Sequence, residues 1–188
     1  HERTNAIATA MIKAGVFRPG QRGLEFGAGT GLLSIALKDY FETIQLLDSS
    51  PEMVRVTQEK LDTQGIQHLT PICLDLETAD FTQGFFDVLF SQMAVHHAGN
   101  IRLLLEKFHA LLNPGGQLFI ADLYAEDGSF HEGAPGVHHG FDPEELAVWC
   151  AAAGYINMQH QTVFTMHKTA TDGSLKTFPV FLFQALRP

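Results

Sequence analysis

The chain has 188 residues, of which 45% are hydrophobic, and its formal net charge at pH 7 is −9. A chain of this length and composition can bury the core of one globular domain, so we predict a single domain over residues 1–188. The excess of acidic residues excludes the basic surface that holds a nucleic-acid backbone or an anionic membrane, and we predict neither partner.

Helix-like and strand-like segments alternate along the first half of the chain. Apolar residues at helical spacing fill residues 3–14, and Gly15 follows them. Further along, Pro51 stands in the first turn of a helix that Ser49 or Ser50 caps. The predicted elements are helix 3–14, strand 23–26, helix 30–38, strand 43–47, helix 51–62 and strand 69–74.

The second half continues the alternation and ends in two strands without a helix between them. Residues 113–116, Asn-Pro-Gly-Gly, predict a tight turn into a strand, and residues 142–145, Asp-Pro-Glu-Glu, predict a helix that Asp142 caps. The last two strands should pair antiparallel. The predicted elements are strand 86–90, helix 101–112, strand 117–121, helix 143–153 and strands 156–166 and 177–186.

Continuous apolar strands separated by amphipathic helices predict an α/β fold. We expect a doubly wound, mostly parallel seven-stranded sheet with helices on both faces and an antiparallel C-terminal hairpin. In such a sheet a ligand binds outside the carboxyl ends of the strands, where the strand order reverses. Residues 126–140, rich in glycine and histidine, form the one long irregular stretch. We predict that this segment, with any residues that precede His1, covers the substrate.

The stretch LEFGAGTGLLS places glycines at alternate positions where the first strand ends. Gly27, Gly29 and Gly31 let the main chain approach a ligand, and the following helix offers free N–H groups. The spacing is G-x-G-x-G, because Leu32 stands where the dinucleotide-binding pattern G-x-G-x-x-G has its third glycine. Glu25 precedes the turn, and its carboxylate would repel a diphosphate and favour a cation. A tight turn without a ligand is the alternative.

Five motifs follow one another along the chain: LEFGAGTG, LLDSSPEMV, LDLE, FDVLFSQMAVHH and LLNPGGQLFIADL. In this order and with these separations they resemble the motifs of class I S-adenosylmethionine-dependent methyltransferases, in particular the small bacterial members of types 11 and 12. The resemblance covers nearly the whole chain. It implies a Rossmann-like methyltransferase fold and S-adenosyl-L-methionine as cofactor, and it leaves the substrate open.

The ends of the second and third strands supply candidate cofactor contacts. Asp48 lies about 20 residues after the glycine turn, where its carboxylate can accept two hydrogen bonds from a ribose diol. The alternative role for Asp48 is a helix cap, which Ser49 or Ser50 can supply instead. By resemblance, Asp75 accepts a hydrogen bond from the adenine amino group, and Leu76 offers the adjacent main-chain N–H.

The resemblance also implies that Met53 contacts the adenine face and that Ser91, Gln92 and Met93 line the methionine end of the cofactor. The run Ser-Gln-Met-Ala at residues 91–94 is not the Asn/Asp-Pro-Pro-aromatic motif of enzymes that methylate adenine bases or glutamine, so we exclude those substrates. The complete predicted cofactor set is Glu25, Gly27, Ala28, Gly29, Gly31, Asp48, Ser49, Met53, Asp75, Leu76, Ser91, Gln92 and Met93.

Candidate catalytic side chains lie after the fourth and fifth strands and in the 126–140 segment. Methyl transfer from a sulfonium is a direct displacement, so aligning the reactants and excluding water matter most, and a general base is optional. The candidates for that base are His97, Asp122, Tyr124 and His139, with His138 beside it. A structural or solvent-exposed role is the alternative for each histidine.

We predict no metal site from the histidines. Neighbouring residues of a strand point to opposite faces, so the pairs at 96–97 and 138–139 cannot easily give two ligands to one ion. A site built from His97, His139 and a carboxylate is geometrically conceivable, but nothing in the spacing specifies it.

These features together predict a cytoplasmic S-adenosylmethionine-dependent methyltransferase for a small-molecule acceptor, monomeric or homodimeric. No apolar run reaches the ~20 residues of a membrane span, and no signal segment opens the sequence. The only cysteines, Cys73 and Cys150, lie in apolar runs and predict buried free thiols in a reducing compartment. The alternatives are a non-catalytic S-adenosylmethionine-binding or partner module, and an NAD(P)-dependent oxidoreductase, which the glycine spacing and Glu25 oppose.

Overall fold

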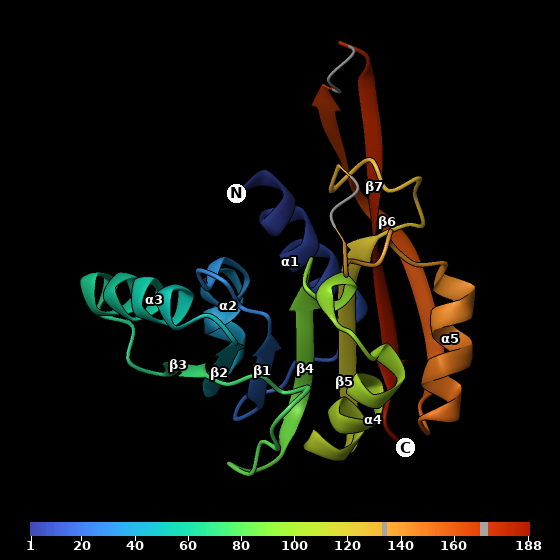
Figure 1. Cartoon of the computed structure of the whole chain (residues 1–188). Coiled ribbons are helices and arrows are strands. Elements are labelled where there is room, and N and C mark those ends of the chain that lie inside the picture. Colours follow the sequence, from blue (N-terminus) through green and yellow to red (C-terminus); the bar gives the residue numbers. More distant parts are fainter. Residues whose placement is uncertain (133–134, 170–172) are drawn as a thin grey trace.

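A seven-stranded sheet forms the centre of the structure, a computed structural model that describes residues 1–132, 135–169 and 173–188. The strands are β1 (Arg22–Phe26), β2 (Thr43–Asp48), β3 (Leu69–Cys73), β4 (Phe86–Gln92), β5 (Leu112–Leu123), β6 (Ile156–Thr169) and β7 (Leu175–Leu186). Their order is β3-β2-β1-β4-β5-β7-β6 (Figure 1). β1 to β5 pair in parallel, and β7 runs antiparallel to β5 and β6, so the predicted fold class is confirmed.

Helices cover both faces of this sheet. In the described residues they are α1 (Glu2–Ala14), α2 (Leu32–Leu37), α3 (Pro51–Gln64), α4 (Ile101–Leu111) and α5 (Pro143–Ala152), with two 3₁₀ turns, η1 (Lys38–Tyr40) and η2 (Val95–His97). Helices α1, α2 and α3 cover one face of the sheet, and α4 and α5 cover the other (Figure 1). The buried side chains of each group share a core cluster with the face that the group covers. The fold is therefore doubly wound, as predicted.

The central strand β4 shows why the strands read as continuous apolar runs. Val88 and Phe90 belong to the core cluster under α1, α2 and α3, whereas Leu89 belongs to the cluster under α4 and α5. All three side chains are fully buried. Since burying such a side chain contributes about 1.5–3 kcal/mol, both faces of the strand select apolar residues.

The predicted caps fix where two helices begin. The Oγ of Ser50 accepts a hydrogen bond from Met53 N at 3.3 Å at the start of α3, and Asp142 Oδ1 accepts one from Glu144 N at 2.9 Å at the start of α5. Each such cap contributes about 1 kcal/mol. α2 begins later than predicted, because Gly31 before it has a left-handed φ of 71° that cannot belong to a helix.

Two local predictions were wrong. Residues 113–116 do not form a separate turn but lie within β5, between the pairs Phe86–Leu112 and Val88–Gln117, so they form a bulge in the strand. Cys73 is exposed at the end of β3, and only Cys150 is buried; both thiols are free.

The C-terminal strands β6 and β7 form a long hairpin that extends beyond the rest of the sheet (Figure 1). β6 lies at the edge of the sheet, and most of its residues are exposed. Among the described residues, none of the helices combines the length and the apolar content that crossing a membrane requires.

Candidate functional site

The turn between β1 and α2 lies at the carboxyl end of β1, beside β4, where the strand order reverses. A cavity of about 350 Å³ opens there. Its walls come from the segments that follow β1, β2, β3 and β4, because parallel strands bring their carboxyl ends to the same edge of a sheet. Seven predicted site residues line it: Gly27, Asp48, Ser49, Asp75, Leu76, Met93 and His97.

The three glycines of the turn all have left-handed backbones, with φ of 65° at Gly27, 54° at Gly29 and 71° at Gly31. A Cβ on Gly27 would lie 2.2 Å from the Cβ of Ala94, and a Cβ on Gly31 would lie 2.9 Å from a methyl group of Thr57. A Cβ on Gly29 would meet no atom within 4 Å. Two glycines are therefore required by packing, and the third leaves open space in front of the main chain, which suits the close approach of a ligand.

Asp48 connects the glycine turn to the end of β2. Its Oδ2 accepts a hydrogen bond from Gly29 N at 2.7 Å, and its Oδ1 accepts one from Ser50 N at 2.9 Å. An ionised carboxylate can accept about four hydrogen bonds, so each oxygen retains capacity for a ligand hydroxyl. Ser50 supplies the side-chain cap of α3, and the ribose role of Asp48 stays a prediction.

Asp75 and Leu76 follow β3, the neighbour of β2 in the sheet, and also line the cavity. Asp75 is exposed, and its Oδ1 accepts a hydrogen bond from Glu77 N at 3.0 Å, which holds the carboxylate at the start of a turn. The side chain of Leu76 is buried, and its carbonyl accepts a hydrogen bond from Lys107 Nζ at 2.8 Å. Both residues therefore have fixed main-chain positions at the cavity.

Seven predicted cofactor residues lie outside the cavity lining: Glu25, Ala28, Gly29, Gly31, Met53, Ser91 and Gln92. Ser91 is buried, and its hydroxyl donates to the main chain of β1 at 2.9 Å. The side-chain amide of Gln92 donates to Thr4 of α1 at 3.3 Å. Ala28 packs against the core under α1, α2 and α3, and Met53 is half-buried in the first turn of α3. Their contacts with a cofactor stay predictions.

Glu25 is buried, with only 2% of the residue exposed, and does not line the cavity. Its Oε2 accepts hydrogen bonds from the main-chain N–H of Ser34, at 3.2 Å, and from the hydroxyl of Ser34. Burial raises the pKa of Glu25 from 4.5 to about 8, against the opposing effect of the Ser34 hydrogen bonds. The carboxyl group therefore holds a proton at neutral pH, so this side chain does not present the charge that we predicted.

We expect Glu25→Gln to stabilise the chain at pH 8 and to leave its stability nearly unchanged at pH 4.5. Between these pH values the folded chain keeps the Glu25 proton, whereas the unfolded chain has lost it, so the stability that this group contributes falls as the pH rises. The free energy of unfolding falls on the order of 1.4 kcal/mol per pH unit in this range. The glutamine carbonyl can accept both hydrogen bonds from Ser34 without ionising. Urea unfolding of both proteins across this range measures the difference, and parallel pH profiles would contradict the prediction.

Behind the wall of the cavity, Asp122 and three histidines form a cluster that the sequence did not reveal. Asp122 is fully buried, and its Oδ1 lies 2.6 Å from His96 Nδ1, while its Oδ2 accepts from His96 N at 3.2 Å. His96 Nε2 lies 3.0 Å from His131 Nε2, and the ring centroids of His96 and His97 are 4.2 Å apart. His97 thus joins the cluster to the cavity that it lines.

Residues 96–97 do not point to opposite faces as predicted, because they lie on the 3₁₀ turn η2 and not on a strand. Burial lowers the pKa of His97 and of His131 below the ordinary range of imidazole, with further lowering by His96. Both rings are therefore neutral at pH 7. His96 and His131 were missed as site residues; the doubled histidine after β4 was a signal for His96, but no sequence signal could have placed His131.

Three predicted catalytic residues, Asp122, Tyr124 and His139, do not line the cavity. The hydroxyl of Tyr124 lies 2.9 Å from Thr162 Oγ1 on β6, and its ring packs on Phe181. The ring of His139 is exposed and lies against Gly128, where an added Cβ would be 2.8 Å from His139 Cε1. Of the four predicted catalytic side chains, His97 alone lines the cavity within the described residues.

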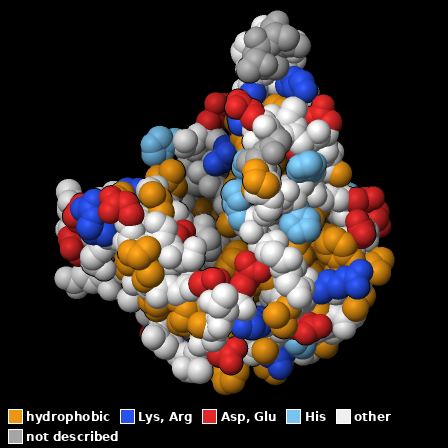
Figure 2. Space-filling model, in the orientation of Figure 1, with side chains coloured by type: hydrophobic (Ala, Val, Ile, Leu, Met, Phe, Trp, Pro, Cys, Tyr) orange, Lys and Arg blue, Asp and Glu red, His pale blue; other side chains and the backbone are white. Residues whose placement is uncertain are grey.

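The 126–140 segment packs over η2. His138 N donates to the carbonyl of His96 at 2.7 Å, and Phe130 is buried against Phe178 of β7. Figure 2 shows histidine side chains on this face of the molecule, over the segment that joins β5 to α5. Residues 133 and 134 of the predicted cover lie outside the described residues, and a covering role for the remainder stays a prediction.

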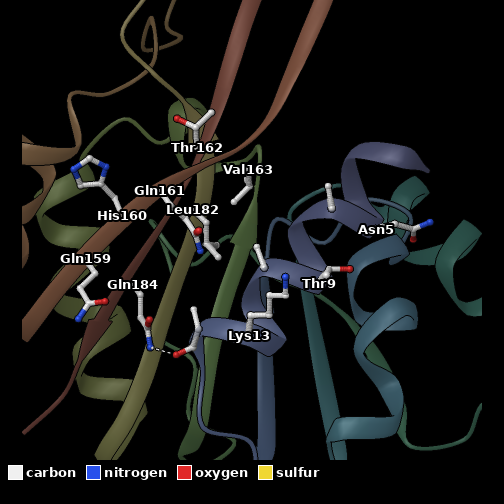
Figure 3. A pocket seen from close by; sticks show the side chains of 13 residues that line it. Asn5, Thr9, Lys13, Gln159, His160, Gln161, Thr162, Val163, Leu182 and Gln184 are labelled. Carbon is white, nitrogen blue, oxygen red and sulfur yellow. Dashed lines mark hydrogen bonds between the residues drawn. The ribbon is translucent and has the colours of Figure 1, made fainter.

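A second, larger cavity of about 820 Å³ lies between α1 and the strands β6 and β7 (Figure 3). Its lining is mainly amide, hydroxyl and small apolar side chains, and Gln184 Nε2 donates to Ala14 O at 3.3 Å. Lys13 and His160 are the titratable side chains in the lining. Because no predicted site residue contributes to it, we place the candidate site at the smaller cavity.

Comparisons with known proteins show which proteins the chain is similar to. The chain is 32% identical over 161 residues to "Uncharacterized methyltransferase C1347.09" of Schizosaccharomyces pombe, covering 82% of this chain and 54% of that protein. It is 28% identical to the ubiquinone biosynthesis O-methyltransferase of Xanthomonas campestris pv. campestris strain B100, covering 79% of this chain and 68% of that protein.

A solved structure of Haemonchus contortus phosphoethanolamine N-methyltransferase 2, in complex with S-adenosyl-L-methionine, has the same fold with a TM-score of 0.80. The sequence identity is 19%, and the match covers 96% of this chain and 52% of that one. The chain thus spans about half the length of several proteins that it matches.

A model of the methyltransferase domain family matches residues 24–120, which run from β1 into β5 and include the glycine turn, Asp48, Asp75 and η2. The matched range is 97 of the 188 residues. This chain therefore belongs to the methyltransferase domain family.

Proposed function

We propose that the chain binds S-adenosyl-L-methionine in the glycine-turn cavity and transfers its methyl group to a small-molecule acceptor. The observation that carries the proposal is Asp48, which main-chain N–H groups of Gly29 and Ser50 hold at the cavity wall. A carboxylate at the end of the second strand suits the two hydroxyl groups of a ribose. Membership of the methyltransferase domain family supports the identity of the donor.

The cavity residues would hold the donor at several points. The main chain of the glycine turn permits close approach, Asp48 accepts from the ribose, and Asp75 accepts from the adenine amino group. When bound, the donor would supply a methyl group on a sulfonium: the acceptor's bond to the methyl carbon forms as the bond from that carbon to sulfur breaks, and the sulfur leaves as a neutral thioether. The protein's main contribution is then to align the acceptor and to exclude water.

His97 is the side chain best placed to take a proton from the acceptor. It lines the cavity, and the lowered pKa of its imidazole leaves the ring neutral at pH 7. A neutral imidazole can accept the proton that a hydroxyl or amine loses as the new bond to the methyl carbon forms. Asp122 is buried on the far side of His96 and does not reach the acceptor.

A small acceptor agrees with the net charge of −9, which disfavours a nucleic acid. The name of the Xanthomonas relative refers to methylation of a small metabolite's oxygen, which supports the same class. We further infer a cytoplasmic location from the two free thiols, and a monomer or homodimer in solution.

The test is methyl transfer from donor labelled at the methyl group to a panel of phenols, catechols, amines and carboxylic acids. We expect label in at least one class of acceptor, and a rate at least about 100-fold lower for His97→Ala with that acceptor. A protein that binds the donor and labels no acceptor would be a binding module, and the proposal would then be wrong.

A further inference from the structure

We propose that His96, His97 and His131 form a binding site for a transition-metal ion such as Zn²⁺ at the wall of the cavity. Each imidazole offers one ring nitrogen, and the three nitrogens lie within 4.8 Å of one another. The inference goes beyond methyl transfer, and ion binding does not depend on it.

The three ligands come from two segments that are distant in sequence. His96 and His97 lie on η2, directly after β4, and the tight 3₁₀ turn brings their ring centroids to 4.2 Å. His131 comes from the 126–140 segment, with its ring centroid 4.9 Å from that of His96 and 5.2 Å from that of His97. An ion held by all three would fasten this segment to the cavity wall.

Asp122 orients His96 in the way that carboxylates orient the histidine ligands of metals. His96 is 1% exposed and Asp122 is fully buried, with 2.6 Å between His96 Nδ1 and Asp122 Oδ1. The carboxylate also accepts from the main-chain N–H groups of His96, at 3.2 Å, and Leu123, at 2.8 Å. It therefore fixes the proton on Nδ1 and directs Nε2 toward His131.

The spacing of two of the three ligand atoms is close to that around an ion. His96 Nε2 and His131 Nε2 are 3.0 Å apart in the structure. Two nitrogens bound to a tetrahedral Zn²⁺, with Zn–N distances of about 2.0–2.1 Å, are roughly 3.3 Å apart. Only small side-chain movements of these two rings are needed, and without an ion the same contact is a hydrogen bond.

Charged groups of both signs act on His131: Asp122 and Glu126 favour a cation there, and Lys168 opposes one. Besides Asp122, the carboxylate of Glu126 acts electrostatically on His131. Glu126 Oε1 is buried and has no hydrogen-bond partner within the part of the chain that the structure describes. Lys168 acts in the opposite sense, but the carbonyl of Phe130 accepts a hydrogen bond from its ammonium group at 2.7 Å.

The all-imidazole donor set selects the kind of ion. Imidazole nitrogens bind Zn²⁺, Ni²⁺ and Cu²⁺, whereas Mg²⁺ and Ca²⁺ prefer oxygen ligands. His97 cannot accept a proton through the nitrogen that holds an ion, so turnover is a poor readout of this site. Binding of the ion itself is the direct test.

Calorimetric titration of ZnCl₂ into the untagged chain, previously treated with a chelator, is expected to show one bound ion per chain and no heat with MgCl₂. His131→Ala and His97→Ala, on two different segments, should each weaken Zn²⁺ binding by more than about 100-fold. Asp122→Asn, which leaves all three ligands in place, should weaken it by about 10- to 100-fold. Circular dichroism shows which variants fold.

His160→Ala is the matched control, because His160 lies on β6 and pairs with Glu144, outside the cluster. It should bind Zn²⁺ as the unmodified chain does. Absence of Zn²⁺ binding by the unmodified chain would overturn the proposal, and the cluster would then be a hydrogen-bonded chain from Asp122 through His96 to His131. Equal Zn²⁺ affinity in a folded His131→Ala or His97→Ala variant would overturn it as well.

Discussion

Replacing Gly27 by alanine is expected to destabilise the fold by about 2–5 kcal/mol and to abolish cofactor binding. The left-handed φ of 65° costs an alanine about 1–2 kcal/mol. The new methyl group would also stand 2.2 Å from the Cβ of Ala94, and such overpacking costs about 1–3 kcal/mol more. Ala94 lines the cavity, so relieving the clash displaces its wall. Urea unfolding and S-adenosylhomocysteine binding measure the two effects.

Gly29→Ala separates the clash from the backbone strain. Gly29 has a similar φ of 54°, but its added Cβ would meet no atom within 4 Å. This variant should therefore lose only the about 1–2 kcal/mol of backbone strain. The double variant Gly27→Ala with Ala94→Gly should recover part of the lost stability. If Gly27→Ala is no less stable than Gly29→Ala, the packing of this turn is not as described.

Replacing Asp48 by alanine is expected to weaken S-adenosylhomocysteine binding by about 100-fold or more. A hydrogen bond to a charged group contributes about 1.5–3 kcal/mol, and two from a ribose diol would be lost together. The variant also frees the N–H groups of Gly29 and Ser50 that Asp48 now holds. Thermal unfolding with and without the ligand measures the loss, because a ligand that binds only the folded state raises the midpoint.

Asp62→Ala is the matched control for Asp48. Asp62 is an exposed carboxylate near the end of α3 that accepts a hydrogen bond from Gln58 and does not line the cavity. The Asp62→Ala substitution removes the same charge from the chain at a position outside the cavity. It should therefore leave the stabilisation by the ligand unchanged. Equal stabilisation of the Asp48→Ala variant and the control would show that the carboxylate does not bind the nucleoside.

The sheet and the cavity could be predicted because both depend on local sequence. The apolar run at 86–90 indicates a strand buried on both faces, and the structure places Val88 and Leu89 in opposite core clusters. Asp48 and Asp75 could be placed at the cavity because each follows a parallel strand, and the ends of such strands share one edge.

The direction in which individual side chains point could not be predicted from local sequence. Tyr124 follows β5 as expected, but its hydroxyl contacts Thr162 on β6. The packing of the C-terminal hairpin determines this contact. His131 reaches His96 only because the 126–140 segment packs over η2. The sequence identifies Glu25 as an acidic residue but does not show that it is buried. Its burial removes the negative charge at neutral pH.

The most direct test of the account is calorimetric titration of the unmodified chain with S-adenosylhomocysteine and, separately, with NAD⁺. We expect one bound S-adenosylhomocysteine per chain, displaced by S-adenosyl-L-methionine, and no heat from NAD⁺, because the turn lacks the third glycine of the dinucleotide pattern. Binding of NAD⁺ in place of S-adenosylhomocysteine, or no binding of either, would contradict it.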